Sequence, residues 1–324
     1  MGMRIAAALG CPPPILGICM AKKIGRLLLL ISAVLLGAFF CSCSFFGSDD
    51  GGITKSESDY LILSYFDADN NLNDDLFRDL ANEQYALSAI EGTAGAPSVK
   101  ILALWDGESE EECASDGNTR VHPNGALYEL GAMDKDQLYR LNSGAETGFV
   151  LSSNTKDLTS SASWLKEEPD MSDVSTLKAF LSWANKYYSA NKVVLMLSDH
   201  GAGTEYEVYS GGIGGYYNDY SSRSLCVDET NGSEKTLSAA DVKNAIADSG
   251  IAVNVIWQDC CLQGNAETAY ILRGNADYLV TSMNLSYGND HYSAIRSLSS
   301  SSTTPLDFAK AVVKAYADTL KSII

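Results

Sequence analysis

A cysteine pair and a single histidine are the residues of this sequence best placed to do covalent chemistry. Cys260 and Cys261 follow the apolar run 251–258, and His200 follows the apolar run 192–198. A thiolate is a strong nucleophile, and a neighbouring imidazole can accept its proton and later return it to a leaving group. Either feature alone is usually structural, but imidazole is scarce in this chain, whose only histidines are His122, His200 and His291. Taken together, the two features leave both nucleophilic catalysis and inert packing open.

Alternating strand and helix patterns must position these groups. Short apolar runs predict strands at 60–66, 99–105, 192–198, 251–258 and 277–282. Helical spacing and capping signals predict helices at 73–90, 174–188, 237–249, 262–273 and 306–320. The weakly patterned segment 106–168 is expected to form loops with a hairpin at 126–141. This order predicts an α/β sandwich with a mostly parallel central sheet flanked by helices.

The ends of two predicted strands carry the candidate site. Catalytic groups of open α/β sheets gather beyond the carboxyl ends of the strands, so His200 and Cys261 would meet if their strands are neighbours. A helix starting at 262 would place the Cys261 thiol at a helix N-terminus, which lowers the pKa of a thiol. Gly201 would let a substrate backbone approach and would offer an unhindered N–H to an oxyanion.

Composition excludes several other functions. The net charge of −18 argues against nucleic-acid binding, because phosphates would be repelled. The eight cysteines show no zinc-type CxxC pairs. Residues 67–72 begin like a calcium-binding EF-hand loop, but Leu72 replaces the required glycine and the later glutamate is missing. The sequence therefore predicts no metal site and no bound cofactor.

The N-terminal segment reads as an export signal. Basic residues at 22–26 precede the apolar run 27–40, which is too short for a comfortable membrane span and is typical of a signal peptide. Residues 20–42 resemble a bacterial lipoprotein signal with Cys43 as the lipidated residue; plain secretion is the alternative. We interpret residues 1–19 as an overcalled start and residues 43–58 as a flexible tether.

Three separated blocks of sequence, in order, resemble the clostripain family of cysteine peptidases, relatives of caspases and gingipains. The resemblance covers residue 60 to the end with gaps in the middle. The blocks are Ala68-Asp69-Asn70-Asn71-Leu72, residues 176–184 leading through 194–197 to Asp199-His200-Gly201, and Asp259-Cys260-Cys261-Leu262 followed by 267–270 and 276–282.

The resemblance implies a caspase-like sandwich at 59–324 that acts as a cysteine endopeptidase. The family motif places the nucleophile on Cys261, the histidine on His200, and the oxyanion hole on the Gly201 and Cys261 amides. Cleavage would follow Arg or Lys, with Asp259 facing the substrate cation and Asp290 as a second specificity carboxylate. By analogy, Arg223 is a candidate self-processing site.

Expected partners are peptides or proteins with Arg or Lys at the cleavage site, and a bacterial membrane through the lipid anchor. The expected localisation is extracytoplasmic, either lipid-anchored or secreted. The family leaves calcium dependence open, and the last helix ends so abruptly that we expect the domain to be incomplete at its C-terminus.

Cys260 replaces a small residue and 284–287 lacks the expected Pro-Gly and acidic features. These departures keep open a non-catalytic surface lipoprotein that binds a peptide or host ligand.

Overall fold

The computed structural model describes residues 54–108, 125–145, 148–203, 225–226, 228, 236–286 and 288–323. The predicted signal peptide with Cys43, most of the tether, His122 and Arg223 lie outside these residues. Among the described residues, no helix combines the length and the apolar character needed to cross a membrane.

A seven-stranded sheet, ordered β4-β3-β2-β1-β5-β6-β7, forms the centre of the fold. Strands β2, β1, β5, β6 and β7 run parallel to one another. At one edge β3 pairs antiparallel with β2, and β4 pairs antiparallel with β3. The strands are β1 (Ser56–Ala68), β2 (Val99–Gly107), β3 (Ala126–Glu129), β4 (Lys156–Asp157), β5 (Tyr188–Ser198), β6 (Val255–Asp259) and β7 (Tyr278–Thr281).

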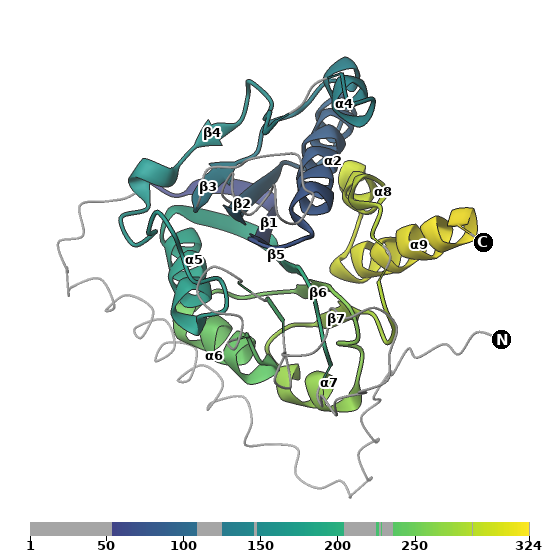
Figure 1. Cartoon of the computed structure of the whole chain (residues 1–324). Helices are drawn as coiled ribbons and strands as arrows, with labels where there is room; N and C mark the ends of the chain where they lie inside the picture. The colour runs from purple at the N-terminus through teal and green to yellow at the C-terminus, as the bar shows by residue number, and fades with distance from the viewer. Residues whose placement is uncertain are drawn as a thin grey trace, which may run out of the picture. The chain divides into compact units, whose positions relative to one another are not determined.

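Helices cover both faces of this sheet (Figure 1). They are α2 (Asn73–Glu91), α4 (Lys135–Asn142), α5 (Val174–Tyr187), α6 (Ala239–Ser249), α7 (Ala266–Leu272), α8 (His291–Arg296) and α9 (Pro305–Ile323), with short 3₁₀ turns η1 (Thr159–Ser161) and η2 (Ser297–Ser299). Alternate residues of β1 enter two separate cores: Ile62 packs on the side of α2, α8 and α9, and Leu63 on the side of α5 and α6. Because both faces are covered, the central strands contain continuous buried apolar runs, such as 60–63 in β1 and 193–197 in β5, rather than an alternating pattern.

The predicted α/β sandwich with a mostly parallel sheet is confirmed, including the capping box at Ser238 and the left-handed Gly250 that ends α6. Three details differ. Strand β1 begins at Ser56, so residues 56–58 belong to the sheet rather than to a tether. The expected hairpin at 126–141 is wrong, because β3 pairs with β2 and the following residues form α4. Helix α8 was not predicted, because six residues show no helical period.

Candidate active site

Strands β5 and β6 are neighbours, which brings the two predicted catalytic residues to one edge of the sheet. The pairing is parallel with Ser198 opposite Asp259, so His200 and Cys261 each lie two residues beyond a matched pair. The backbone contact continues past the strands, since the Asp199 N–H donates to the Asp259 carbonyl at 3.4 Å. The pairing of β5 with β6 thus places the His200 imidazole and the Cys261 thiol on two adjacent turns at the same edge of the sheet.

Gly201 is the point at which these two turns touch. A Cβ built on Gly201 would lie 2.2 Å from the Cys261 carbonyl oxygen and 3.0 Å from the Cys261 amide nitrogen. No side chain fits at that distance from backbone atoms, so the close approach requires glycine. The two amides predicted as oxyanion donors, those of Gly201 and Cys261, therefore belong to turns in direct contact.

The His200 ring is held by an asparagine that follows β1. His200 Nε2 lies 2.7 Å from Asn71 Oδ1. An amide oxygen only accepts, so Nε2 carries the proton and Nδ1 is left as the acceptor. Burial lowers the pKa of His200 to about 4. The imidazole is thus neutral at pH 7 and able to take a proton.

The Cys261 thiol does not lie at a helix start, and that expectation is wrong. Helix α7 begins at Ala266, and Asn265 caps it. Burial raises the pKa of Cys261; the Ser286 N–H, 3.2 Å from Sγ, opposes this, while Asp259 and Asp199 add to it. The resting pair is therefore a neutral thiol beside a neutral imidazole. No helix N-terminus lies at Cys261 to lower the pKa of its thiol.

The turn after the thiol has an unusual backbone. Leu262 has a φ of 61°, a left-handed conformation that residues with a branched side chain seldom adopt. Its N–H donates to the Asn284 carbonyl at 3.1 Å, and the Gly264 N–H donates to the Ser282 carbonyl at 2.7 Å. The loop after β7 thus holds the turn that carries Cys261 through two backbone hydrogen bonds.

The two adjacent cysteines have different environments. Cys260 is buried in the core beside α5 and α6, whereas Cys261 is half-buried. Burial and nearby charges raise the pKa of Cys260 well above its ordinary value. Of the two thiols, only that of Cys261 is open to a substrate.

Asp259, predicted to face a substrate cation, is 8 % exposed and already has partners on both oxygens. Oδ2 lies 2.7 Å from His291 Nε2, and Oδ1 accepts from the Asn289 side-chain amide. Its role in specificity remains a prediction, and these contacts count against it.

His291 is a buried histidine that the sequence analysis did not assign to the site. Its ring is completely buried, 3.2 Å from Glu83 Oε1 and 3.8 Å from Asp79 Oδ2, besides the bond to Asp259. Burial by itself lowers the pKa of His291, but Asp79, Asp259 and Glu83 outweigh it and raise the pKa well above its usual value. The scarcity of histidine was the one signal in the sequence that could have singled it out.

Asp290 is the N-cap residue of helix α8. Its side chain accepts from the Ser293 N–H at 2.8 Å and caps α8. The capped helix positions His291, the first residue of α8. A second specificity carboxylate at Asp290 stays a prediction.

Comparison with known proteins places the chain in a family. The family model described as "Clostripain family" matches residues 64–324. Clostripain from Hathewaya histolytica is 27% identical over 240 residues, covering 70% of this chain and 39% of that protein. The chain thus spans well under half the length of that curated relative.

Solved structures show the same fold. A secreted C11 cysteine protease from Bacteroides thetaiotaomicron, in complex with an irreversible peptide inhibitor, superposes with a TM-score of 0.56 at 18% identity. That match covers 82% of this chain and 59% of the other. An inactive zymogen C11 protease from Parabacteroides distasonis gives a TM-score of 0.51 at 15% identity, covering 83% and 61%. Since the family model matches most of the sequence, the chain belongs to the clostripain family of cysteine peptidases.

Proposed function

We propose that this chain is a cysteine endopeptidase in which Cys261 is the nucleophile and His200 the general acid and base. The observation that carries the proposal is the matched register of β5 and β6, which sets the two side chains at equivalent positions beyond adjacent strands. The half-buried Cys261 and the neutral His200, whose Nδ1 is left as acceptor, support these roles.

The chemistry follows from these protonation states. His200 Nδ1 takes the thiol proton as Sγ attacks the carbonyl carbon of the scissile bond. The Gly201 and Cys261 N–H groups stabilise the negative oxygen of the tetrahedral intermediate. The C–N bond then breaks, and the amine leaves with the proton from His200. Water, deprotonated by the same imidazole, hydrolyses the thioester and regenerates the thiol.

Cleavage after Arg or Lys is the proposed specificity, and it follows from the resemblance to the family. A substrate cation that reached Asp259 would have to share this carboxylate with His291 and Asn289. A panel of peptides that differ only in the residue before the cleaved bond measures this directly. A preference for Arg or Lys that survives in Asp259→Asn would assign the specificity to another residue.

Export and lipid attachment at Cys43 complete the proposal, on the signal-like pattern at 20–42. Metabolic labelling with a fatty acid, in the native chain and in Cys43→Ala, tests the attachment. Loss of label in the variant supports it; secretion of an unlabelled native chain contradicts it.

An activity-based label tests the catalytic part. We expect an Arg-directed acyloxymethyl ketone to label Cys261 on intact cells. Labelling should disappear in Cys261→Ala and persist in Cys260→Ala, the matched control whose thiol is buried. No label on a correctly folded native protein would favour the non-catalytic lipoprotein that binds a peptide.

A further inference from the structure

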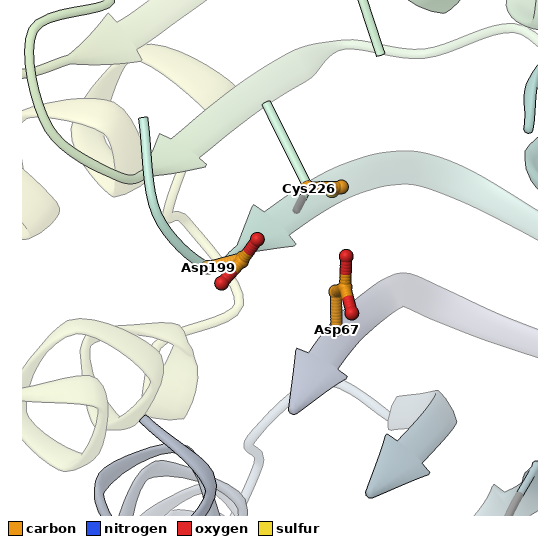
Figure 2. Close-up of side chains that lie close together, drawn as sticks. All are labelled: Asp67, Asp199 and Cys226. Carbon is orange, nitrogen blue, oxygen red and sulfur yellow. The ribbon is translucent and has the colours of Figure 1, made fainter. Parts of the chain in front are cut away.

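A buried group of acidic side chains lies beside the proposed catalytic edge and takes no part in the chemistry described above. Asp67 is the second-last residue of β1, Asp199 directly follows β5, and Cys226 lies farther along the chain (Figure 2). Their ligand atoms all lie within 4.8 Å of one another, and all three residues are buried. The register that pairs Phe66 with Ser198 sets Asp67 beside Asp199.

The burial and missing hydrogen bonds of Asp67 indicate that this group could bind a ligand. Its side chain is 0% exposed, and neither carboxylate oxygen has a hydrogen-bond partner. Such a buried, unpaired carboxylate is strongly unfavourable unless it is protonated or bound to a cation. Figure 2 shows Asp67 and Asp199 extending into the same small region near Cys226.

Further negative groups surround Asp67. Burial raises its pKa well above the usual range, and nearby carboxylates add to this effect. These neighbours are Asp199, Asp228, Asp106 and Asp69. Cys226 is a buried free thiol whose pKa is raised first by burial and then by neighbouring groups that include Asp67 and Asp199. The carboxylates around Asp67 therefore favour a bound cation between Asp67, Asp199 and Cys226.

We propose that Asp67, Asp199 and Cys226 bind a divalent cation of intermediate hardness, with Zn²⁺ the best fit. Zinc accepts carboxylate oxygen and thiolate sulfur together in sites of about four ligands. Calcium and magnesium take oxygen ligands, and calcium takes about six to eight of them. On binding, the Cys226 thiol loses its proton to solvent, and the cation compensates the buried carboxylates.

The ion would join three segments of the catalytic edge. Leu225, next to Cys226, forms a bridge with Gly201, and Asp199 directly precedes His200. Asn70 Nδ2 also donates to Asp199 Oδ1 at 2.8 Å, next to the Asn71 that holds His200. A cation bound here would thus fix Leu225 and Cys226 against the turn that carries His200.

Metal binding can be measured without peptidase activity, so its result is independent of the proposed function. The full chain carrying Cys261→Ala, which removes the nucleophile as a competing ligand, is stripped with a chelator and dialysed against Zn²⁺ or Co²⁺. We expect tight binding of Zn²⁺, and with Co²⁺ the near-ultraviolet charge-transfer absorption of a thiolate ligand. Asp67→Asn and Cys226→Ser should each weaken Zn²⁺ affinity by about 100-fold or more.

Cys260→Ser is the matched control, because its buried thiol lies outside the three ligands. It should keep the native affinity and the cobalt absorption. The proposal is overturned if the chain binds no Zn²⁺, if Cys226→Ser keeps both affinity and absorption, or if Cys260→Ser loses them instead. Binding of Ca²⁺ in place of Zn²⁺, unchanged by Cys226→Ser, would also overturn it. Asp67→Asn gives a second check, since apo protein should become more stable while the thermal shift caused by Zn²⁺ is lost.

Discussion

Two histidines flank the turn that carries Cys261, and their environments are opposite. His200 is half-buried and bonds one neutral amide, that of Asn71. His291 is fully buried among three carboxylates, those of Asp79, Glu83 and Asp259. The pKa of His200 falls to about 4 through burial, whereas the pKa of His291 rises well above its usual value.

The contrast shows that burial alone does not set the charge of a histidine. Burial disfavours the charged ring in both places, and only His291 has enough negative neighbours to reverse that effect. One ring is thus left neutral, with a nitrogen free to accept a proton. The other is an imidazolium that compensates buried carboxylates and ties α2, α8 and the end of β6 together.

The largest expected effect is that of His200→Ala on activity. Removing the proposed base leaves a neutral thiol with a raised pKa, so kcat/KM should fall by about 10⁴-fold or more. Stability in urea should change little, because the ring is half-buried and its hydrogen bond goes to the neutral side chain of Asn71. Steady-state kinetics with the preferred peptide measures this. A loss below 10-fold would assign the base to another residue.

In contrast to His200→Ala, which should mainly lower activity, His291→Leu should mainly lower the stability of the fold. The substitution leaves Asp259 and Glu83 buried without their cation, which typically costs about 3–5 kcal/mol. Urea unfolding followed by circular dichroism measures the change, with His200→Leu as the matched control. If both variants unfold at the same urea concentration, the buried charge network does not stabilise the fold.

The pH dependence of stability should separate the two histidines. The pKa of His291 is raised on folding, so its stabilisation is fully present below the unfolded value of about 6.5. This contribution is lost as the pH rises through the folded-state pKa. The difference in unfolding free energy between the native chain and His291→Leu should therefore shrink with increasing alkalinity.

The pH dependence of the stability contributed by His200 is opposite to that of His291. Its pKa is depressed to about 4, so the unfolded chain binds the proton first and stability falls as the pH drops from about 6.5 towards 4. His200→Leu should lose this acid dependence, measured by urea unfolding at a series of acidic pH values. An unchanged acid dependence in that variant would contradict the lowered pKa.

The smallest expected effect concerns the asparagine that holds His200. Asn71→Ala removes one hydrogen bond to the ring and should lower kcat/KM by about 3- to 10-fold. Asn71→Asp keeps an acceptor but adds a negative charge, so it should move the acid limb of the pH–rate profile to higher pH. Matching profiles for Asn71→Asp and the native chain would contradict direct contact between the two residues.

Strong local signals made the sheet and most helices predictable. Buried parallel strands appear as continuous apolar runs, and the capping box and terminal glycine of α6 are read within a few residues. The turns at Asp199-His200 and Asp259-Cys260-Cys261 could be proposed as one site because both follow such runs. By contrast, the start of α7 was misplaced by several residues, since no strong signal separates 262 from Ala266.

The sequence by itself determined the sandwich, the scarcity of histidine and the two strand ends that carry His200 and Cys261. The tertiary structure alone decided which cysteine is accessible, that Asn71 orients His200, and that Asp259 pairs with His291 rather than standing open. It also brought Asp67, Asp199 and Cys226 together, although no metal-binding spacing links them along the chain. Local periodicity specifies elements within about ten residues, whereas burial, charge and ligand sets arise from segments that only the folded sheet makes neighbours.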